Sequence, residues 1–515
     1  MDKATNSVAQ RYGQLEAERL TFLNRGRRAA ELTIPSLLPK EGHTATSEFI
    51  TPYQAVGARG VNNLASKLLL ALLPPNSPFF RLSIDEATLQ AIAQNQRGAV
   101  EAGLAKVERT AMQEIETSAL RVPVYEALRQ LIVAGNSLLY IPPVGGVRAF
   151  RLDRFVVKRD AMGNVLEIIT KETVSPQMLP DEAKAMLNDP NDNGQRNIDL
   201  FTYCCRKEGR FQLYQEVNGN ILPSSMGAVP LDRNPFIPLR FTRIDGEDYG
   251  RGYVEEYFGD LASLEGLSQA IVEGSAAAAK LLFLVRPNGT TKMKALAEAP
   301  NGAFVQGNSD DVSVLQLQKA GDFRVALETM KQINDRLSFA FLLNGSVQRD
   351  AERVTAEEVR FMAQELESAL GGVYSILSQE LQLPLIKNVM FRLEDQGKLP
   401  PMPRDTIKPQ IITGLEALGR GQDLNKLATF LKFLQPLGPE IIAREMNVDD
   451  YIDRLGASLG IDTDGLIKSP EQKAMEAQQA AAAQQNQMMM QMAQEVIGKA
   501  TPAVAQGYIK QTVGE

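Results

Sequence analysis

The segment Arg336–Leu383 constrains the architecture more than any other part of the chain, because it joins two helix-forming runs through one short polar loop. The second run opens with Thr355 and has Glu358 three residues later, which is the pattern of a capping box. Apolar residues then recur at helical spacing along one face: Val359, Met362, Ala363, Leu366, Leu370, Val373, Leu377 and Leu381. We predict a long helix that bends at Gly371-Gly372 and at Pro384, which suits a structural support better than a catalytic pocket.

Composition limits the functions open to this chain. Its 515 residues suffice for several domains or for one large elongated protomer. A formal net charge of −7 argues against tight nucleic-acid binding, because such binders concentrate Lys and Arg against phosphates. Met1–Arg28 shows no secretory signal, and uncharged apolar runs such as Leu68–Pro75 are too short to cross a bilayer. We therefore expect a soluble protein.

Few residues could carry catalytic or metal chemistry. Cys204 and Cys205 are adjacent, where a disulfide would be strained, so we expect two reduced thiols. His43 is the sole histidine and lies in a polar loop, which argues against a zinc site and against a Ser–His–Asp triad. Neither Gly397-Lys398 nor Gly498-Lys499 is followed by the hydroxyl that a P-loop needs for Mg²⁺. We predict no enzymatic activity, no metal and no cofactor.

The sequence patterns divide the chain into helical and β-prone regions. Residues 1–140 are mainly helical, and helix returns at Gly250–Leu284, Asp322–Leu343 and Thr413–Gly460. In the first region the predicted helices are Tyr53–Leu73, Val100–Leu120 and Pro123–Leu139. Short β-prone runs between turn residues predict an antiparallel β region. These runs are Leu138–Ile141, Ala149–Lys158, Val165–Thr173, Asp199–Arg206, Arg210–Val217 and Phe236–Phe241.

Two further regions carry turn and low-complexity signals. Leu282–Gln318 places Pro-Asn-Gly and Gly-Asn-Ser turns between short apolar runs, which predicts a small module with some strands. Pro470–Glu515 is rich in Ala, Gln and Met and has high helix propensity. For this tail two interpretations stay open, a frayed or disordered segment or a helical tube formed with copies of itself.

The predicted helix around Ile244–Lys280 is strongly acidic, with eight acidic and two basic residues and a net charge of −6. Its acids include Glu255, Glu256, Asp260, Glu265 and Glu273. If the helix is repeated around a pore, such a wall lets duplex DNA slide, because each cationic contact would add affinity and hence friction. A solvated outer face on an ordinary helix explains the same charges.

Five segments resemble the portal protein, or head-to-tail connector, of short-tailed, podovirus-type (autographivirus-like) bacteriophages. They are Thr51–Lys67, Tyr125–Asn136, Asp245–Glu256, Arg336–Leu383 and Thr413–Leu424. The likeness follows the same order from about residue 20 to about residue 470. It implies a mainly α, α+β protomer that assembles into a ring, typically a homododecamer, at one capsid vertex.

The resemblance also implies a division of the chain into named parts. In chain order they are the wing (1–243), the first stem helix (244–281), the clip (282–318), the second stem helix (319–343), the tunnel loop (344–354), the long bent wing helix (355–400), the crown (401–469) and the tail (470–515), a helical barrel or disordered.

The function implied by the resemblance is that of a passive channel. The terminase large subunit drives double-stranded DNA through it during packaging, and the DNA is later ejected. Further implied partners are capsid and scaffolding proteins, internal core proteins, and the tail adaptor and nozzle proteins, with no membrane. The implied location is the head–tail junction of the virion, after assembly in the host cytoplasm.

The resemblance assigns residues to this channel. Tunnel-loop residues near the DNA would be Asn344, Gln348, Arg349 and Arg353. The two arginines would contact phosphates without sequence selectivity. Alternatively, they would only fix the loop by pairing with acids of neighbouring subunits, namely Asp350, Glu352 or Glu357. Lys292 and Lys294 of the clip would face the terminase, and the acidic helix would form the channel wall.

Two other classes of protein stay open. A helical core or tail adaptor protein of the virion would also be acidic and oligomeric, but should lack the order helix–clip–helix–loop–long helix. A nuclease acting on packaged DNA would need a carboxylate metal site.

Overall fold

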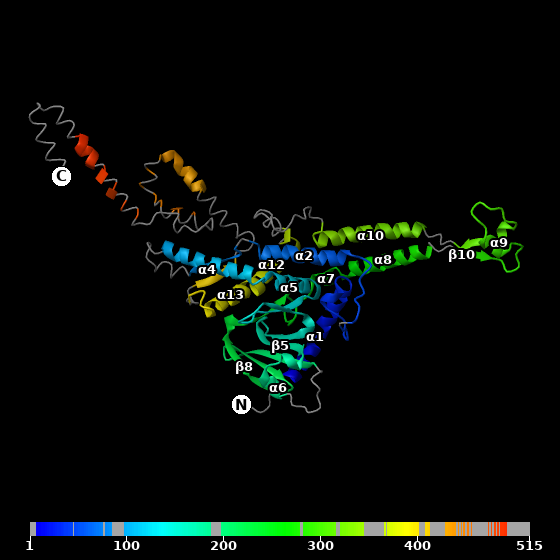
Figure 1. Ribbon diagram of the computed structural model, residues 1–515, viewed down its shortest axis with the longest axis horizontal. Helices are drawn as coiled ribbons and strands as arrows, with labels where there is room; N and C mark the ends of the chain where they lie inside the picture. Colours follow the sequence, from blue (N-terminus) through cyan, green and yellow to red (C-terminus); the bar gives the residue numbers. More distant parts are fainter. Residues whose placement is uncertain are drawn as a thin grey trace, which may run out of the picture. The chain divides into compact units, whose positions relative to one another are not determined.

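The computed structural model divides the chain into two compact units, Met1–Gly419 and Arg420–Glu515, each taken here by itself (Figure 1). The structure describes residues 7–44, 46–75, 78–84, 97–186, 197–278, 282–315, 320–343, 365–366, 368–400, 407–411, 428–438 and individual residues between 441 and 491. Within these residues, no helix combines the length and the apolar character needed to cross a lipid bilayer.

The first unit begins with a layer of helices. They are α1 (Val8–Glu31), α2 (Val56–Leu72), α4 (Arg97–Thr117) and α5 (Arg121–Ala134). Helix α5 packs against both α1 and α2. Helix α2 lies within the predicted helix Tyr53–Leu73, and its Val61, Leu64 and Leu68 are fully buried in the main core. Removing these side chains from water fixes α2 in the layer.

Two antiparallel sheets follow, as predicted for this region. The smaller has the order β3-β2-β9 and the larger β4-β5-β6-β7-β8. The strands are β2 (Asn136–Tyr140), β3 (Arg148–Phe150), β4 (Phe155–Arg159), β5 (Val165–Val174), β6 (Ile198–Lys207), β7 (Arg210–Val217), β8 (Asn220–Pro230) and β9 (Phe236–Arg240). Asn218-Gly219 joins β7 to β8, and both residues have positive φ angles, 49° and 79°, as a tight hairpin requires.

Two predictions at the start of the β region are wrong in detail. Ala149–Lys158 is not one strand, because a 3₁₀ turn at Leu152–Arg154 separates β3 from β4, which enter different sheets. The helix predicted over Pro123–Leu139 ends at Ala134. Gly135 follows in the left-handed conformation, with a φ of 74°, and the chain then enters β2.

Strand β8 has no counterpart among the predicted strands. Its residues Pro223, Gly227 and Pro230 are typical of turns. The strand stands at the edge of its sheet, where a missing backbone donor is tolerated.

Beyond the sheets, two long helices lie side by side (Figure 1). The first consists of α7 (Tyr253–Glu256) and α8 (Phe258–Ala278), and the second is α10 (Ala320–Ala340). The helix predicted over Gly250–Leu284 is therefore too long, because Leu282–Val285 forms strand β10 and pairs with β11 (Val312–Leu315). The small module with strands is confirmed, and it also contains α9 (Met293–Ala297).

The later part of the first unit contains a bent helical region. It comprises α12 (Val373–Leu377), a π-helical turn (Ser378–Gln382) and α13 (Leu383–Asp395). The predicted break at Gly371-Gly372 is confirmed, since Gly371 has a φ of 55° and α12 begins only after it. A π-helical turn comes just before the turn of α13 that holds Pro384, where we predict the second bend. Leu366, Leu370, Leu377 and Leu381 are buried, as the apolar face predicts. The predicted capping box lies outside the described residues.

Three short elements complete the secondary structure discussed here. Strand β1 (Phe80–Ile84) pairs with β12 (Ile407–Ile411), and α6 (Asp181–Met186) follows β5. In the second unit, residues 428–434 are helical, within the predicted helical segment Thr413–Gly460.

Candidate functional site

The two long helices are joined at one end by the aromatic side chain of Tyr253. Its hydroxyl donates a hydrogen bond of 2.9 Å to the carbonyl of Ala340, the last residue of α10. Its ring stands edge-on to that of Phe341, with 5.6 Å between ring centroids. Burial raises the pKa of Tyr253, so the phenol keeps its proton and can donate at neutral pH. The start of α7 and the end of α10 are therefore held together.

Helix α2 supports the same junction from another direction. The side-chain amide of Asn63 donates to the carbonyls of Phe341 and Leu342, at 3.0 and 2.9 Å. These carbonyls follow the end of α10, where backbone acceptors lack helical partners. Leu342 has a positive φ of 54°, which turns the chain away from the helix axis. The direction in which the chain leaves α10 is thus fixed by a side chain of α2.

The segment that follows this junction is the predicted tunnel loop. Asn344, Gln348, Arg349 and Arg353 all lie outside the described residues. The last described residue before that predicted loop is Leu343.

Three of the five acids assigned to the channel wall interact with basic or backbone groups of the same chain. Glu255 pairs with Arg251 at 3.1 Å, and Asp260 pairs with Arg336 of α10 at 2.7 Å. Glu265 accepts hydrogen bonds from the backbone N–H groups of Tyr53 and Gln54, at 2.9 and 3.1 Å. Glu265 therefore anchors the chain just before α2, and Asp260 ties α8 to α10.

The other two wall acids are exposed. Glu273 accepts a hydrogen bond from Gln269 at 2.9 Å. Partial desolvation, and then the charge of Glu255, raise the pKa of Glu256. In the part of the chain that the structure describes, neither acid has an ion-pair partner.

The β10–β11 module is organised around the carboxylate of Asp311. It accepts hydrogen bonds from the Thr290 hydroxyl and from the backbone N–H and hydroxyl of Thr291, each 3.1 Å long. Lys292 and Lys294 are exposed beside this network, at the start of α9. Phe304 of the same module is fully exposed. The module thus presents two cations and one aromatic ring to solvent.

Comparison with known proteins now settles the family. Residues 5–467 match the family described as bacteriophage head to tail connecting protein. The chain belongs to this family. It is 44% identical to the portal protein of Escherichia phage T7 over 490 residues, covering 93% of this chain and 90% of that protein. It is also 44% identical to the portal protein of Enterobacteria phage T3, and this match covers 90% of this chain and 88% of that protein.

More distant relatives of this head-to-tail connecting protein also match over most of its length. The portal protein of Enterobacteria phage SP6 is 31% identical, and the match covers 98% of this chain and 98% of that protein. A solved neck structure of an empty gene transfer agent particle is 13% identical with a TM-score of 0.34, covering 73% of this chain and 86% of that one. The expected resemblance and the mixed, mainly helical fold of a portal-type protomer are confirmed.

The structure also assigns roles to residues that sequence reasoning did not single out. Asn63 lies inside the segment Thr51–Lys67, which carries part of the family resemblance, yet its partners are about 280 positions away. Nothing in the local pattern indicates such a contact. Only the position of Asn63 on the polar edge of an otherwise apolar helix could have drawn attention to it.

Proposed function

We propose that copies of this head-to-tail connecting protein form a ring whose channel is lined by the pair α8 and α10. Large apolar side chains on these helices are exposed in the single chain: Val272, Val325, Leu327 and Phe339, with 53, 67, 54 and 76% of their surface accessible. Exposed apolar side chains gathered on neighbouring helices are typical of surfaces that another protein covers. A neighbouring copy is the natural occupant, because a ring repeats the same contact around its axis.

In this proposal the named parts keep their predicted bounds. The wing is 1–243 with the long bent helix 355–400, the stem is 244–281 and 319–343, and the clip is 282–318. The tunnel loop is 344–354, and the crown and tail follow at 401–469 and 470–515. The junction at Tyr253 and Asn63 supports this division, since it fixes both stem helices to the wing at the start of the tunnel loop.

We propose that the ring acts as a passive conduit for double-stranded DNA. The terminase large subunit would push the genome in from the clip side, near Lys292 and Lys294, and the tail adaptor and nozzle proteins would later take its place. Capsid, scaffolding and internal core proteins would surround the ring. The acidic stem supports this proposal, because exposed carboxylates such as Glu273 repel phosphates and keep the duplex from adhering.

The tunnel loop supplies the sharper test of DNA contact. In the proposal Arg349 and Arg353 touch phosphates at the constriction, with Gln348 and Asn344 beside them. Replacing both arginines by Ala should leave rings intact but reduce the DNA retained in filled heads. Unchanged packaging and retention would favour the alternative in which the arginines only pair with neighbouring acids.

The function as a whole is tested by reconstitution. Proheads assembled with and without this chain are mixed with terminase, ATP and linear duplex DNA, and nuclease-protected DNA is measured. We expect protection only when the chain is present. Equal protection in both samples would instead favour a core or tail adaptor protein. Incubation of the purified chain with DNA and Mg²⁺ should give no cleavage, whereas cleavage would reveal an enzyme.

A further inference from the structure

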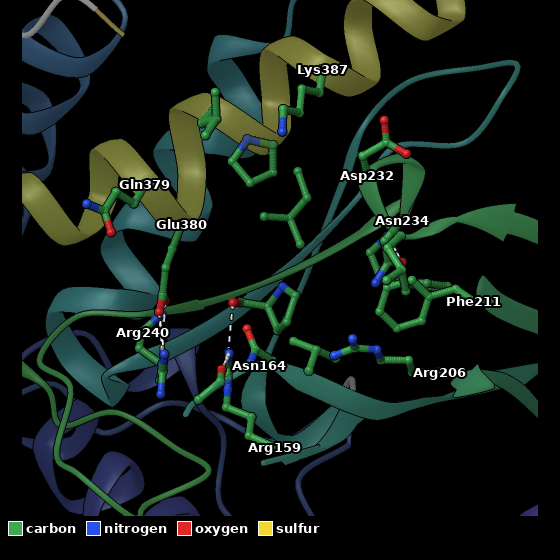
Figure 2. Close-up of a pocket in the computed structure, with 18 of the residues that line it drawn as sticks. Arg159, Asn164, Arg206, Phe211, Asp232, Asn234, Arg240, Gln379, Glu380 and Lys387 are labelled. Atoms are coloured by element: carbon green, nitrogen blue, oxygen red, sulfur yellow. Dashed lines mark hydrogen bonds and ion pairs between the residues drawn. The ribbon is translucent and has the colours of Figure 1, made fainter. Parts of the chain in front are cut away.

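A pocket of about 510 Å³ opens between the β region and the bent helical region of the first unit (Figure 2). One wall consists of the β4–β5 turn, the ends of β6 and β9, and Phe211 of β7. The facing wall is formed by residues 379–388 of the π-helical turn and α13. Its size is typical of a binding pocket for a ligand or a short peptide segment.

The charge of this pocket is opposite to that of the whole chain. Its lining contains five basic side chains, Arg159, Arg206, Arg240, Arg243 and Lys387. Against these stand two acidic side chains, Asp232 and Glu380, which leaves an excess of three positive charges. The chain as a whole has a net charge of −7. A positive hollow on a negative protein attracts anionic partners over several ångströms.

The acid closest to these cations has a structural role. Glu380 of the π-helical turn binds the guanidinium of Arg240 and also accepts from its backbone N–H. This pair connects the two walls, because Arg240 ends β9 and Glu380 belongs to the helical side (Figure 2). The ion pair therefore joins the two walls of the pocket, and among the basic side chains of the lining it is Arg240 that binds Glu380 directly.

The remaining cations interact with neutral groups or with solvent. Arg159 donates to three backbone carbonyls, those of Asp248, Gly163 and Pro238. Burial, and then the charge of Arg240, lower the pKa of Arg159 to about 10, so it stays protonated at neutral pH. Arg243 donates to the Met162 carbonyl.

Two basic side chains are left for a ligand. Arg206 is exposed at the end of β6 and Lys387 is half-buried on α13. Among the residues that the structure describes, neither forms an ion pair with a carboxylate. Arg206 affects Asp160 of the β4–β5 turn, whose pKa is lowered by a hydrogen bond from Asn164 and, more weakly, by the charge of Arg206. They stand on different walls of the pocket, Lys387 on the helix and Arg206 on the strand side (Figure 2).

We propose that this pocket binds an acidic peptide segment of a partner protein, with an apolar side chain between carboxylates. A compact inorganic anion needs donors that converge on one point, whereas these cations lie on separate walls. The lining also contains apolar side chains, among them Phe211, Leu383 and Pro384. Such an arrangement suits a ligand that carries charge at both ends and an apolar group in the middle.

The test uses the purified full-length chain and a fluorescein-labelled peptide Asp-Asp-Leu-Phe-Asp-Asp, followed by fluorescence anisotropy at low salt. We expect saturable binding with a Kd below about 1 mM, weakened by added salt. The same peptide with Asn in place of Asp should bind at least about tenfold more weakly. No DNA or assembled ring is needed, so failure here is distinguishable from failure of the proposed channel.

Matched variants connect the binding to this pocket. The double change Arg206→Glu and Lys387→Glu should weaken the acidic peptide about tenfold or more. Lys207→Glu is the control, because Lys207 follows Arg206 in β6, is equally exposed and does not line the pocket. Circular dichroism and thermal unfolding show whether each variant is folded. If the double Glu variant is not folded, the milder double change Arg206→Gln and Lys387→Gln takes its place.

Several outcomes would overturn the proposal. They are no anisotropy change at millimolar peptide, equal binding of the Asn peptide, or equal weakening by Lys207→Glu. Displacement of the peptide by inorganic phosphate or ATP at lower concentration than by unlabelled peptide would assign the pocket to a small anion instead.

Discussion

Asn136 and Gly250 join two segments that lie 114 positions apart in the chain. The side-chain amide of Asn136 donates to the Gly250 carbonyl at 2.9 Å and accepts from the Gly250 N–H at 2.7 Å. Asn136 opens β2, and Gly250 lies just before α7. Both residues belong to segments that carry the family resemblance. The contact fixes the segment just before α7 to the start of β2.

Replacing Asn136 by Ala should destabilise the protein by about 2–3 kcal/mol. Among the residues that the structure describes, both backbone polar groups of Gly250 are paired through this buried amide. Leaving them without partners costs most of their desolvation energy. The measurement is the free energy of unfolding obtained from urea denaturation. Asn62→Ala is the control, because Asn62 is exposed on α2, and its free energy of unfolding should stay within about 0.5 kcal/mol of the parent's. Equal free energies of unfolding for the two variants would contradict this role.

Replacing Asn63 by Ala should loosen the end of α10 without unfolding the chain. The carbonyls of Phe341 and Leu342 would lose their side-chain donor. Hydrogen exchange followed by mass spectrometry should show residues 338–343 exchanging about tenfold faster, which corresponds to about 1.4 kcal/mol. Asn62→Ala, one position earlier on the same helix, should leave that exchange unchanged. If exchange is equally slow in both variants, α2 does not hold the end of α10.

Gly60 is a position where even one added methyl group should be costly. A Cβ atom there would lie 2.5 Å from the ring of Phe341, so Gly60→Ala should cost about 1–3 kcal/mol through overpacking. Gly103→Ala in α4, where nothing lies within 4 Å, should instead stabilise by about 0.5–1 kcal/mol. Combining Gly60→Ala with Phe341→Leu should cost less than the sum of the two single changes. Strict additivity would show that the two residues do not touch.

The two cysteines should react slowly, and at a rate that depends on pH. Burial raises the pKa of both thiols, and Cys204 is fully buried whereas Cys205 is half-buried. Only the thiolate is alkylated, so labelling by iodoacetamide should rise about tenfold per pH unit between pH 7 and 9. Cys204 should be the slower of the two, as peptide mass spectrometry will show. A rate that levels off below pH 9 would contradict the raised pKa.

Much of the fold could be predicted because its signals are local. The predicted strand Arg210–Val217 coincides with β7, and the predicted helix Tyr53–Leu73 contains α2. Gly135 was inside a predicted helix, because the apolar pattern of α5 continues smoothly into β2. A left-handed glycine decides the boundary there, and a Cβ atom at this position would lie 2.4–2.8 Å from backbone atoms of Arg251, Gly252 and Gly250.

The site was harder to predict because its contacts join distant segments. The acidic bias of α8 was visible in the sequence, but the sequence could not show that Glu265 anchors the backbone before α2 or that Asp260 pairs with Arg336. The positive pocket is a sharper example. Its basic residues come from four separate segments between Arg159 and Lys387, and no window of the sequence brings them together.

The central claim is that this chain forms a ring around an open channel, and electron microscopy of the purified protein tests it most directly. End-on class averages should show closed rings with a central hole wide enough for duplex DNA. Particles that remain single protomers, or closed assemblies without such a hole, would contradict the claim.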